Sequence, residues 1–284
     1  MNENMIAVIG AGTMGHGIAQ LAAESGFDVQ MIDVSAAALE SGLASINKTL
    51  ERALSREKVT PAHVSQTLSR LSTATDFTKV SQARLVIEAA SENPEIKRSI
   101  FCELDDAADP NAILASNTSS ISLTEIAAGS TRPEQVIGMH FFNPAPVMAL
   151  VELIRALQTS DETFAATKEI AKRMGKSPVE VKDSPGFVVN RMLVPMINEA
   201  VFVYSEGVAS VEDIDAAMKL GSNHPMGPLA LADLIGLDIC LSVMEVLFDE
   251  FADSKYRPCP LLKKMVAAGY LGRKSGRGFY SYGK

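Results

Sequence analysis

The sequence predicts an α/β protein in which a doubly wound sheet with a helical-hairpin insert is followed by a smaller all-α domain. Short apolar strand patterns alternate with helical patterns from residue 5 to about residue 182. A glycine-rich turn joins the first strand pattern to the first helical pattern. After the turn cluster at residues 183–186, only long apolar helical patterns follow. We therefore expect two domains, residues 1–183 and residues 187–284.

Composition excludes several classes of protein. The net charge of the 284 residues is −8, which argues against non-specific nucleic-acid binding. No apolar run approaches the roughly 18 residues of a membrane span, and the first residues lack the basic region of a signal peptide. The three cysteines are an odd count without a CxxC pair, so a disulfide framework or a zinc site is not expected. We expect a cytoplasmic protein that binds no metal, nucleic acid or membrane.

A G-x-G-x-x-G sequence follows the first expected strand, residues 5–9, and opens a helix that stops at Gly26. In this context the glycines permit a tight turn, a close approach of the backbone to a pyrophosphate, and packing of the helix on the strand. The free N–H groups at the helix N-terminus would receive the pyrophosphate. The alternative is an ordinary glycine-rich turn. The motif favours a Rossmann-type dinucleotide site, and its residues are Gly10, Ala11, Gly12, Thr13, Met14 and Gly15.

The second expected strand, residues 28–32, ends at Asp33. Asp33 lies 18 residues after Gly15, where a carboxylate can accept a hydrogen bond from the ribose 2′-hydroxyl of a dinucleotide. The same charge would repel a 2′-phosphate. We therefore expect the cofactor to be NAD and not NADP.

The pattern of residues 35–71 is helical, and Pro61 opens a second helix within it. Thr49, Arg52 and Arg56 recur at helical spacing, so they share one stripe of the first helix. Such a stripe either receives a phosphate-bearing ligand or is an ordinary solvated face, and the pattern itself supports both.

Two later strands, residues 85–87 and 112–115, also lead into polar residues. The first ends near Glu88, and the second runs into five small polar residues at 116–120. One explanation is N-capping of the helix expected at residues 123–128 by Ser120 or Ser122. Capping accounts for one serine but not for five polar residues in a row, so we expect a ligand-facing segment.

The strand pattern of residues 136–139 places His140 at a strand's carboxyl end, where ligands bind in open α/β sheets. Pro144 and Pro146 force a turn, and the chain returns through an apolar run, residues 147–154. Glu152 lies inside that run, where an unpaired charge is costly. A Glu152–His140 pair would fix the tautomer of the imidazole and suit it to be a general base. The alternative is a structural core histidine beside an unrelated surface charge.

The remaining residues predict one more helix and strand and then the helical domain. We expect its long apolar faces to be partly buried against the first domain or a second subunit. Its basic glycine loop, residues 272–280, precedes a short strand and either forms a surface tail or closes over the nucleotide. The expected elements are a helix at 163–174, a strand at 178–181, and helices at 187–205, 210–221, from 228, 238–251 and 261–268.

Taken together, these motifs resemble the short-chain 3-hydroxyacyl-CoA dehydrogenase family over essentially the whole chain. The shared sequences are G-A-G-T-M-G-H-G-I-A-Q from residue 10, E-x-x-x-x-K at 92–97, S-N-T-S-S at 116–120, H-F-F-N-P at 140–144, D-S-P-G-F-V-V-N-R at 183–191 and K-S-G-R-G-F-Y at 274–280.

The resemblance implies NAD-dependent oxidation of an (S)-3-hydroxyacyl-CoA to the 3-oxoacyl-CoA, and the reverse. It implies that His140 is the catalytic base, that Glu152 orients it, and that Ser119 and Asn190 position the substrate. Coenzyme A contacts fall on Thr49 and Arg56, with an Arg where relatives carry Lys. The implied NAD contacts beyond the glycine motif and Asp33 are Glu92, Lys97, Ser119, Asn143 and Lys274.

Two other interpretations fit the same fold. A dehydrogenase of a free hydroxy acid, such as a gulonate-type substrate, would keep the His–Glu pair without coenzyme A contacts. A non-catalytic NAD-binding protein would need none of the four implied active-site residues, which are all present. The sequence leaves the acyl chain open, and the helical domain and the resemblance predict a homodimer.

Overall fold

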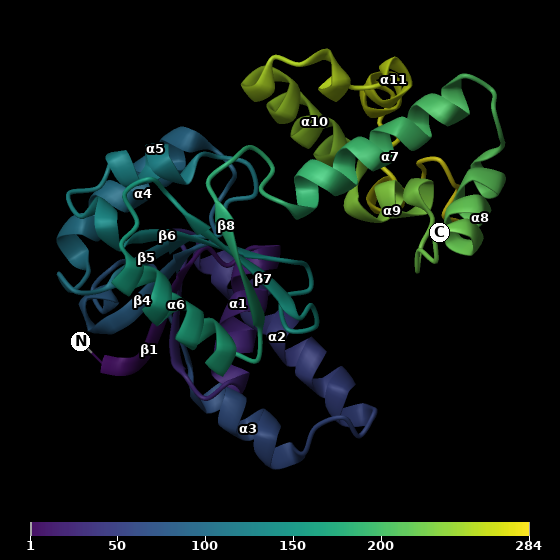
Figure 1. Ribbon diagram of the computed structural model, residues 1–284. Helices are drawn as coiled ribbons and strands as arrows, with labels where there is room; N and C mark the ends of the chain where they lie inside the picture. The colour runs from purple at the N-terminus through teal and green to yellow at the C-terminus, as the bar shows by residue number, and fades with distance from the viewer. Residues whose placement is uncertain (1, 284) are drawn as a thin grey trace. The chain divides into compact units, whose positions relative to one another are not determined.

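The computed structural model describes residues 2–283, and the chain divides into two compact units, Met1–Asp183 and Ser184–Lys284. The first unit contains the sheet, and the second is helical (Figure 1). Among residues 2–283, no helix is both long and apolar enough to cross a bilayer.

An eight-stranded sheet of order β3-β2-β1-β4-β5-β6-β7-β8 forms the centre of the first unit. The first six strands of the chain are parallel, β7 is antiparallel to β6, and β8 is parallel to β7. The predicted doubly wound sheet is confirmed. The strands are β1 (Asn2–Ile9), β2 (Asp28–Ile32), β3 (Leu71–Ala74), β4 (Ala83–Glu88), β5 (Ile113–Ser116), β6 (Val136–Phe141), β7 (Leu150–Arg155) and β8 (Ser177–Lys182).

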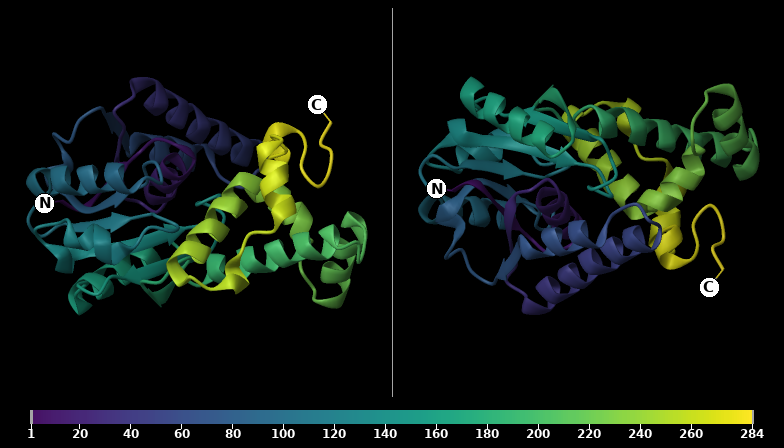
Figure 2. Two further views of the ribbon diagram at one scale, coloured as in Figure 1. Left: turned by 90° about the horizontal axis from the view of Figure 1, so that it is seen from above. Right: turned by 90° about the horizontal axis from the view of Figure 1, so that it is seen from below.

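Helices connect these strands, and two of them form the predicted hairpin insert. Thr60 caps the second hairpin helix, and Pro61 occupies its first turn, where a missing N–H costs nothing. In both views of Figure 2, α1 lies between the sheet and the long helix α2, and α1 contacts both. The helices are α1 (Thr13–Glu24), α2 (Ala36–Ser55), α3 (Pro61–Ser69), α4 (Pro94–Ala107), α5 (Leu123–Ala128) and α6 (Asp161–Arg173), with 3-10 turns η1 (Val80–Gln82) and η2 (Pro133–Gln135).

Several strand boundaries differ from the prediction: β1 begins at Asn2 and not at residue 5, and two further differences have a physical reason. Residues 71–74 form the edge strand β3, whereas the sequence pattern placed Leu71 in a helix. This short segment has little apolar character of its own, and its strand conformation comes from pairing with β2. The strand β7 begins at Leu150 and not at residue 147, because the preceding residues form a turn that Lys176 holds through the carbonyls of Ala145 and Met148.

The core of the sheet unit is closely packed. Ile6 and Val8 of β1 and Ile18 of α1 are at most 1% exposed and belong to one apolar cluster. Burial of each such side chain contributes about 1.5–3 kcal/mol. Helix α6 packs into the same cluster through Phe164 and Ile170, so this core supports both the glycine-rich turn after β1 and the β6–β7 hairpin.

The second unit is a cluster of helices around Ile197, Leu229 and Leu262. Its tail differs from the prediction, because Gly272, Arg277 and Ser281 form isolated bridges, and no strand follows the glycine loop within the described residues. Asp233 fixes this tail by accepting hydrogen bonds from the backbone N–H groups of Phe279 and Tyr280. The helices are α7 (Val189–Ser205), α8 (Val211–Gly221), α9 (Pro228–Ile235), α10 (Leu237–Phe251) and α11 (Pro260–Ala267), with 3-10 turns η3 (Ser254–Tyr256) and η4 (Arg273–Ser275).

Candidate active site

The β6–β7 hairpin brings His140 and Glu152 together. The two residues are direct cross-strand partners, and Nδ1 of His140 lies 2.7 Å from Oε2 of Glu152. His140 is 6% exposed and Glu152 is 1% exposed. A buried carboxylate at this distance from Nδ1 favours the tautomer with its proton on Nδ1 and stabilises the imidazolium. The predicted pair therefore exists in the geometry that acid–base chemistry needs.

Asn117 fixes the end of β6 beside this pair. Its side-chain oxygen accepts a hydrogen bond of 2.9 Å from the backbone N–H of Phe141, the residue after His140. The backbone N–H of Asn117 in turn donates to the carbonyl of Glu88. The ends of β4, β5 and β6 are thus joined by hydrogen bonds at the edge of the sheet where ligands bind.

The glycine-rich turn has the shape that a dinucleotide requires. A Cβ at Gly10 would lie 2.6 Å from the carbonyl oxygen of Ala89, and one at Gly15 would lie 1.9 Å from the carbonyl oxygen of Gly10. These two glycines are therefore needed for packing. A Cβ at Gly12 would meet nothing within 4 Å, and Gly12 is the N-cap of α1 without a side-chain cap. Open space in front of uncapped N–H groups suits a pyrophosphate.

Asp33 lies just after β2 and is half-buried. Its two carboxylate oxygens accept hydrogen bonds from the backbone N–H groups of Ala11 and Ser35, both at 2.9 Å. The carboxylate is therefore held against the glycine-rich turn. Each oxygen has a second lone pair, so the geometry remains compatible with a hydrogen bond from a ribose hydroxyl.

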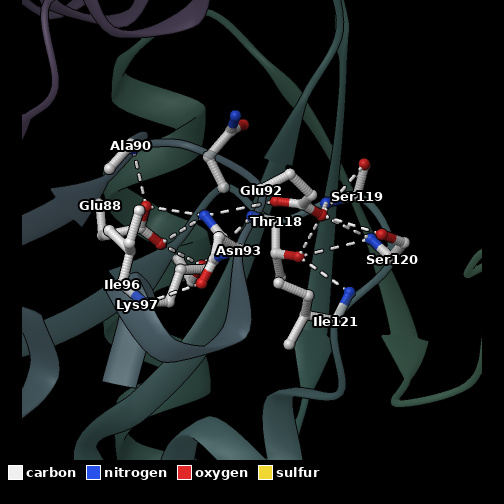
Figure 3. A network of polar contacts seen from close by, with 12 residues as sticks. Glu88, Ala90, Glu92, Asn93, Ile96, Lys97, Thr118, Ser119, Ser120 and Ile121 are labelled. Atoms are coloured by element: carbon white, nitrogen blue, oxygen red, sulfur yellow. Dashed lines mark hydrogen bonds and ion pairs between the residues drawn. The ribbon is translucent and has the colours of Figure 1, made fainter. Parts of the chain in front are cut away.

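Glu92 gathers the polar segment that follows β5 (Figure 3). Its Oε1 accepts from the Thr118 hydroxyl at 2.6 Å, the Ser119 N–H at 2.8 Å and the Ser120 N–H at 3.0 Å. The Ser119 hydroxyl is the most distant donor, at 3.2 Å. Burial alone would raise the pKa of Glu92, but the charge of Lys97 and these hydrogen bonds outweigh it and lower the pKa below its usual value.

A second buried ion pair, not predicted from the sequence, lies behind Glu92. Nζ of Lys97 is 2.7 Å and 2.9 Å from the two carboxylate oxygens of Glu88, the last residue of β4. Lys97 is 1% exposed and Glu88 is 0% exposed. The sequence pattern predicts only that Glu88 lies near the end of a strand. One signal in the sequence could have indicated this pair: Glu88 ends an apolar strand, and Lys97 follows nine residues later.

Lys176 is a further functional candidate that the sequence did not reveal. Its ammonium group donates to the carbonyls of Ala145 at 2.6 Å and Met148 at 2.8 Å, and burial lowers the pKa of Lys176. The turn that it holds connects β6 to β7 and carries the exposed Asn143. The same turn packs against α1, because a Cβ at Gly17 would meet Ala145 at 3.5 Å.

The other predicted residues lie outside this group. Thr49 and Arg56 are exposed on or beside α2, and the hydroxyl of Thr49 donates to the carbonyl of Ser45. Asn190 lies in the first turn of α7 and Lys274 in η4, both in the helical unit. Within that unit, Nζ of Lys274 lies 2.6 Å from the carboxylate of Asp238. Their predicted ligand contacts, and that of Lys97, stay predictions.

Comparison with known families matches nearly the whole chain. Residues 5–184 match the family model described as "3-hydroxyacyl-CoA dehydrogenase, NAD binding domain". Residues 186–282 match the model described as "3-hydroxyacyl-CoA dehydrogenase, C-terminal domain". The two matches meet close to the division between the sheet unit and the helical unit.

Individual relatives are similar over their full length. A probable 3-hydroxybutyryl-CoA dehydrogenase of Bacillus subtilis is 56% identical over 99% of this chain and 98% of its own. A 3-hydroxybutyryl-CoA dehydrogenase of Bradyrhizobium diazoefficiens is 56% identical over 98% of this chain and 94% of its own. A crystal structure of (S)-3-hydroxybutyryl-CoA dehydrogenase from Ralstonia eutropha, 56% identical, superposes with a TM-score of 0.96 over 99% of both chains.

Proposed function

The chain belongs to the 3-hydroxyacyl-CoA dehydrogenase family, and from this premise we propose that His140 and Glu152 are its acid–base pair and (S)-3-hydroxybutyryl-CoA its substrate. The reaction is the NAD-dependent oxidation of a 3-hydroxyacyl-CoA to the 3-oxoacyl-CoA and its reverse. The family resemblance and the NAD cofactor predicted from the sequence are both confirmed. The observation that carries the proposal is the buried 2.7 Å contact between Nδ1 of His140 and Glu152.

Oxidation of a 3-hydroxyl group requires the removal of its proton as hydride leaves C3. Bound NAD supplies the hydride acceptor. In our proposal His140 takes the proton on Nε2, because Glu152 engages Nδ1 and stabilises the imidazolium that forms. In the reverse direction the imidazolium returns the proton to the oxygen. The burial of the pair strengthens this electrostatic stabilisation, since bulk water does not screen it.

Ser119 and Asn190 are the proposed substrate-positioning groups. The hydroxyl of Ser119 has the longest hydrogen bond to Glu92, at 3.2 Å, and it shares an oxygen with four shorter donors. Because one carboxylate oxygen has only two lone pairs, this hydroxyl is the donor that a substrate oxygen can recruit at least cost. The amide of Asn190 would supply the second polar contact. Correct placement of C3 is a large part of the catalytic advantage in such sites.

The remaining cofactor and coenzyme contacts complete the proposal. The glycine motif and Asp33 would bind NAD as predicted, aided by Glu92, Lys97, Ser119, Asn143 and Lys274. Thr49 and Arg56 would bind coenzyme A, which their exposed positions on or beside α2 permit. The names of the relatives at 56% identity support a four-carbon acyl group.

We also propose that the helical unit completes the substrate site and forms a homodimer. Large apolar side chains of this unit are exposed, including Met192 at 71% and Leu220 at 87%. The free cysteines Cys102, Cys240 and Cys259 support the proposal of a reducing, cytoplasmic location. Sedimentation of the purified protein tests the dimer, because a concentration-independent monomer would contradict it.

The test of function is the consumption of NADH with acetoacetyl-CoA, beside acetoacetate and NADPH as controls. We expect fast turnover only with the thioester and NADH. Turnover with acetoacetate or another free hydroxy or oxo acid, and none with acetoacetyl-CoA, would favour the free-acid dehydrogenase. A series of acyl chains would then define the pocket.

A further inference from the structure

The carboxylate of Glu88 is fully occupied by donors from its own unit. Oε1 accepts from Lys97 and from the backbone N–H of Ala90 at 2.7 Å, and Oε2 accepts from Lys97 and from the Ser116 hydroxyl at 2.6 Å. Two donors reach each oxygen, which uses the lone pairs of the group. Glu88 is therefore suited to hold its neighbours in place and not to bind a ligand.

Stability alone does not explain a buried ion pair at this position. Removing two charges from water is costly, and a well-packed apolar pair of similar volume is often as stable or more stable. Three apolar residues, Leu85, Val86 and Ile87, come directly before Glu88 in β4, and all three are 0% exposed. A change from apolar residues to a charged residue at the last position of the strand, next to the proposed active site, points to a role in the site, because departures from the local pattern gather at functional sites.

Lys97 connects the buried carboxylate to the surface. Its Nζ also lies 3.3 Å from Oε2 of Glu92, whose side chain is 37% exposed. The other oxygen of Glu92 collects the donors of residues 118–120, including both the N–H and the hydroxyl of Ser119. A continuous set of charge-assisted contacts thus runs from Glu88 through Lys97 and Glu92 to Ser119 (Figure 3).

Glu88 also holds the segment that contacts the glycine-rich turn. The hydrogen bond that Glu88 accepts from the N–H of Ala90 fixes the chain beside Ala89, whose carbonyl oxygen lies 2.6 Å from the position of a Cβ at Gly10. The residue therefore sits between the turn that would bind NAD and the segment that carries Ser119. Glu88 therefore holds the backbone at Ala90 and the side chain of Ser116 at the same time.

We propose that Glu88 and Lys97 are positioning residues that hold Glu92, and through it the hydroxyl of Ser119, in the orientation that the substrate requires. This inference rests on the proposed role of Ser119 in binding the substrate. Neither Glu88 nor Lys97 touches the substrate in this arrangement. Their effect on turnover passes through the 118–120 segment.

A double-mutant cycle with Glu88→Gln and Ser119→Ala tests the proposal. We expect Glu88→Gln alone to lower kcat/KM for acetoacetyl-CoA by about 10²-fold, the order of loss for a misplaced catalytic contact. In the Ser119→Ala background the same change should cost less than about threefold, because coupled residues are not additive. If Glu88→Gln lowers kcat/KM by the same factor in both backgrounds, the positioning role of Glu88 is overturned, whereas the proposed role of Ser119 is not. An unchanged kcat/KM in Ser119→Ala overturns both.

Two further variants distinguish an effect on positioning from an effect on folding. Glu88→Gln combined with Lys97→Gln leaves no lone buried charge, so we expect it to fold while kcat/KM stays about 10²-fold low. The control is Asp105→Asn, because Asp105 is a buried carboxylate that holds Ser130 and Thr131 and pairs with Arg132 at 3.4 Å. The control should lose thermal stability with kcat/KM within about twofold. Near-normal kcat/KM in the double-Gln protein, or an equal loss in the control, overturns the proposal.

Discussion

Two buried ion pairs lie near the carboxyl ends of β4 and β6, two strands that β5 separates, and the pairs differ in the chemistry of their basic member. His140 beside Glu152 carries an imidazole, the side chain that most often acts as a general acid and base in enzymes. Lys97 beside Glu88 carries an ammonium group, and the carboxylate of its partner also accepts hydrogen bonds from Ala90 and Ser116. We infer that the first pair takes part in proton transfer, whereas the second pair holds neighbouring residues in position. The identity of the cation separates the roles more clearly than burial, which the two pairs share.

The largest effect should come from the removal of the imidazole of the first pair. His140→Ala should lower kcat by about 10² to 10⁴, the usual contribution of general acid–base catalysis. Steady-state kinetics with acetoacetyl-CoA and NADH measure the loss. His63→Ala, on α3, is the control and should retain normal turnover. Near-normal turnover of His140→Ala would remove the distinction between the two pairs.

Glu152→Gln should produce the next largest loss. The change keeps the shape of the side chain but removes the charge that stabilises the imidazolium. Hydrogen bonds to charged groups are worth about 1.5–3 kcal/mol, which corresponds to a kcat lower by ~10- to 100-fold. The KM for NADH should stay within about twofold. A change confined to KM would show that Glu152 supports binding and not proton transfer.

Lys176 extends the comparison to a third buried charge, one that holds backbone carbonyls. Lys176→Met would leave the carbonyls of Ala145 and Met148 without their donor, at a cost of about 1–3 kcal/mol in the free energy of unfolding. We expect a several-fold higher KM for NADH, because the turn carries Asn143.

The control for Lys176 is Lys172→Met, which removes an exposed lysine from the neighbouring helix α6. This change should alter stability by less than about 0.5 kcal/mol and leave KM unchanged. Equal KM values for NADH in the two proteins would argue that the turn does not need its buried ammonium group.

The smallest effect should be a pH dependence of the stability that Glu92, the exposed partner of Lys97, contributes. The pKa of Glu92 is lowered below its usual value of 4.5 by Lys97 and hydrogen bonds that outweigh burial. A carboxyl with a depressed folded pKa adds stability above its unfolded pKa and loses it as the pH falls through the folded pKa. The difference in Tm between wild type and Glu92→Gln should therefore shrink below about pH 4.5. A difference that grows on acidification would contradict this.

Local patterns predicted most of the fold. The start of β2 and the limits of α5 follow from Asp28 and from the Ser122 cap, which the apolar periodicity and capping chemistry specify. The strand β3 was missed because its conformation depends on pairing with β2, which no local pattern encodes. Pairing across the sheet is a long-range property, and short edge strands depend on it most.

The candidate site divides in the same way. The His140–Glu152 pair could be predicted because both residues lie on one hairpin, close in the sequence. Glu88 and Lys176 could not, because their partners come from other elements and because a single charged residue has no periodicity. The roles of Asn190 and Lys274, which belong to the helical unit, remain predictions from the family resemblance.

The antiparallel pairing of β6 with β7 has a consequence for how this enzyme can vary. Since His140 and Glu152 face each other across the ladder, insertions or deletions in the connecting turn can change its length without separating them. A single-residue insertion inside β7 would instead turn every later side chain to the opposite face of the sheet. The alignment of the acid–base pair therefore does not limit the length of the turn, whereas the carbonyls that Lys176 holds and the proposed cofactor contact of Asn143 do.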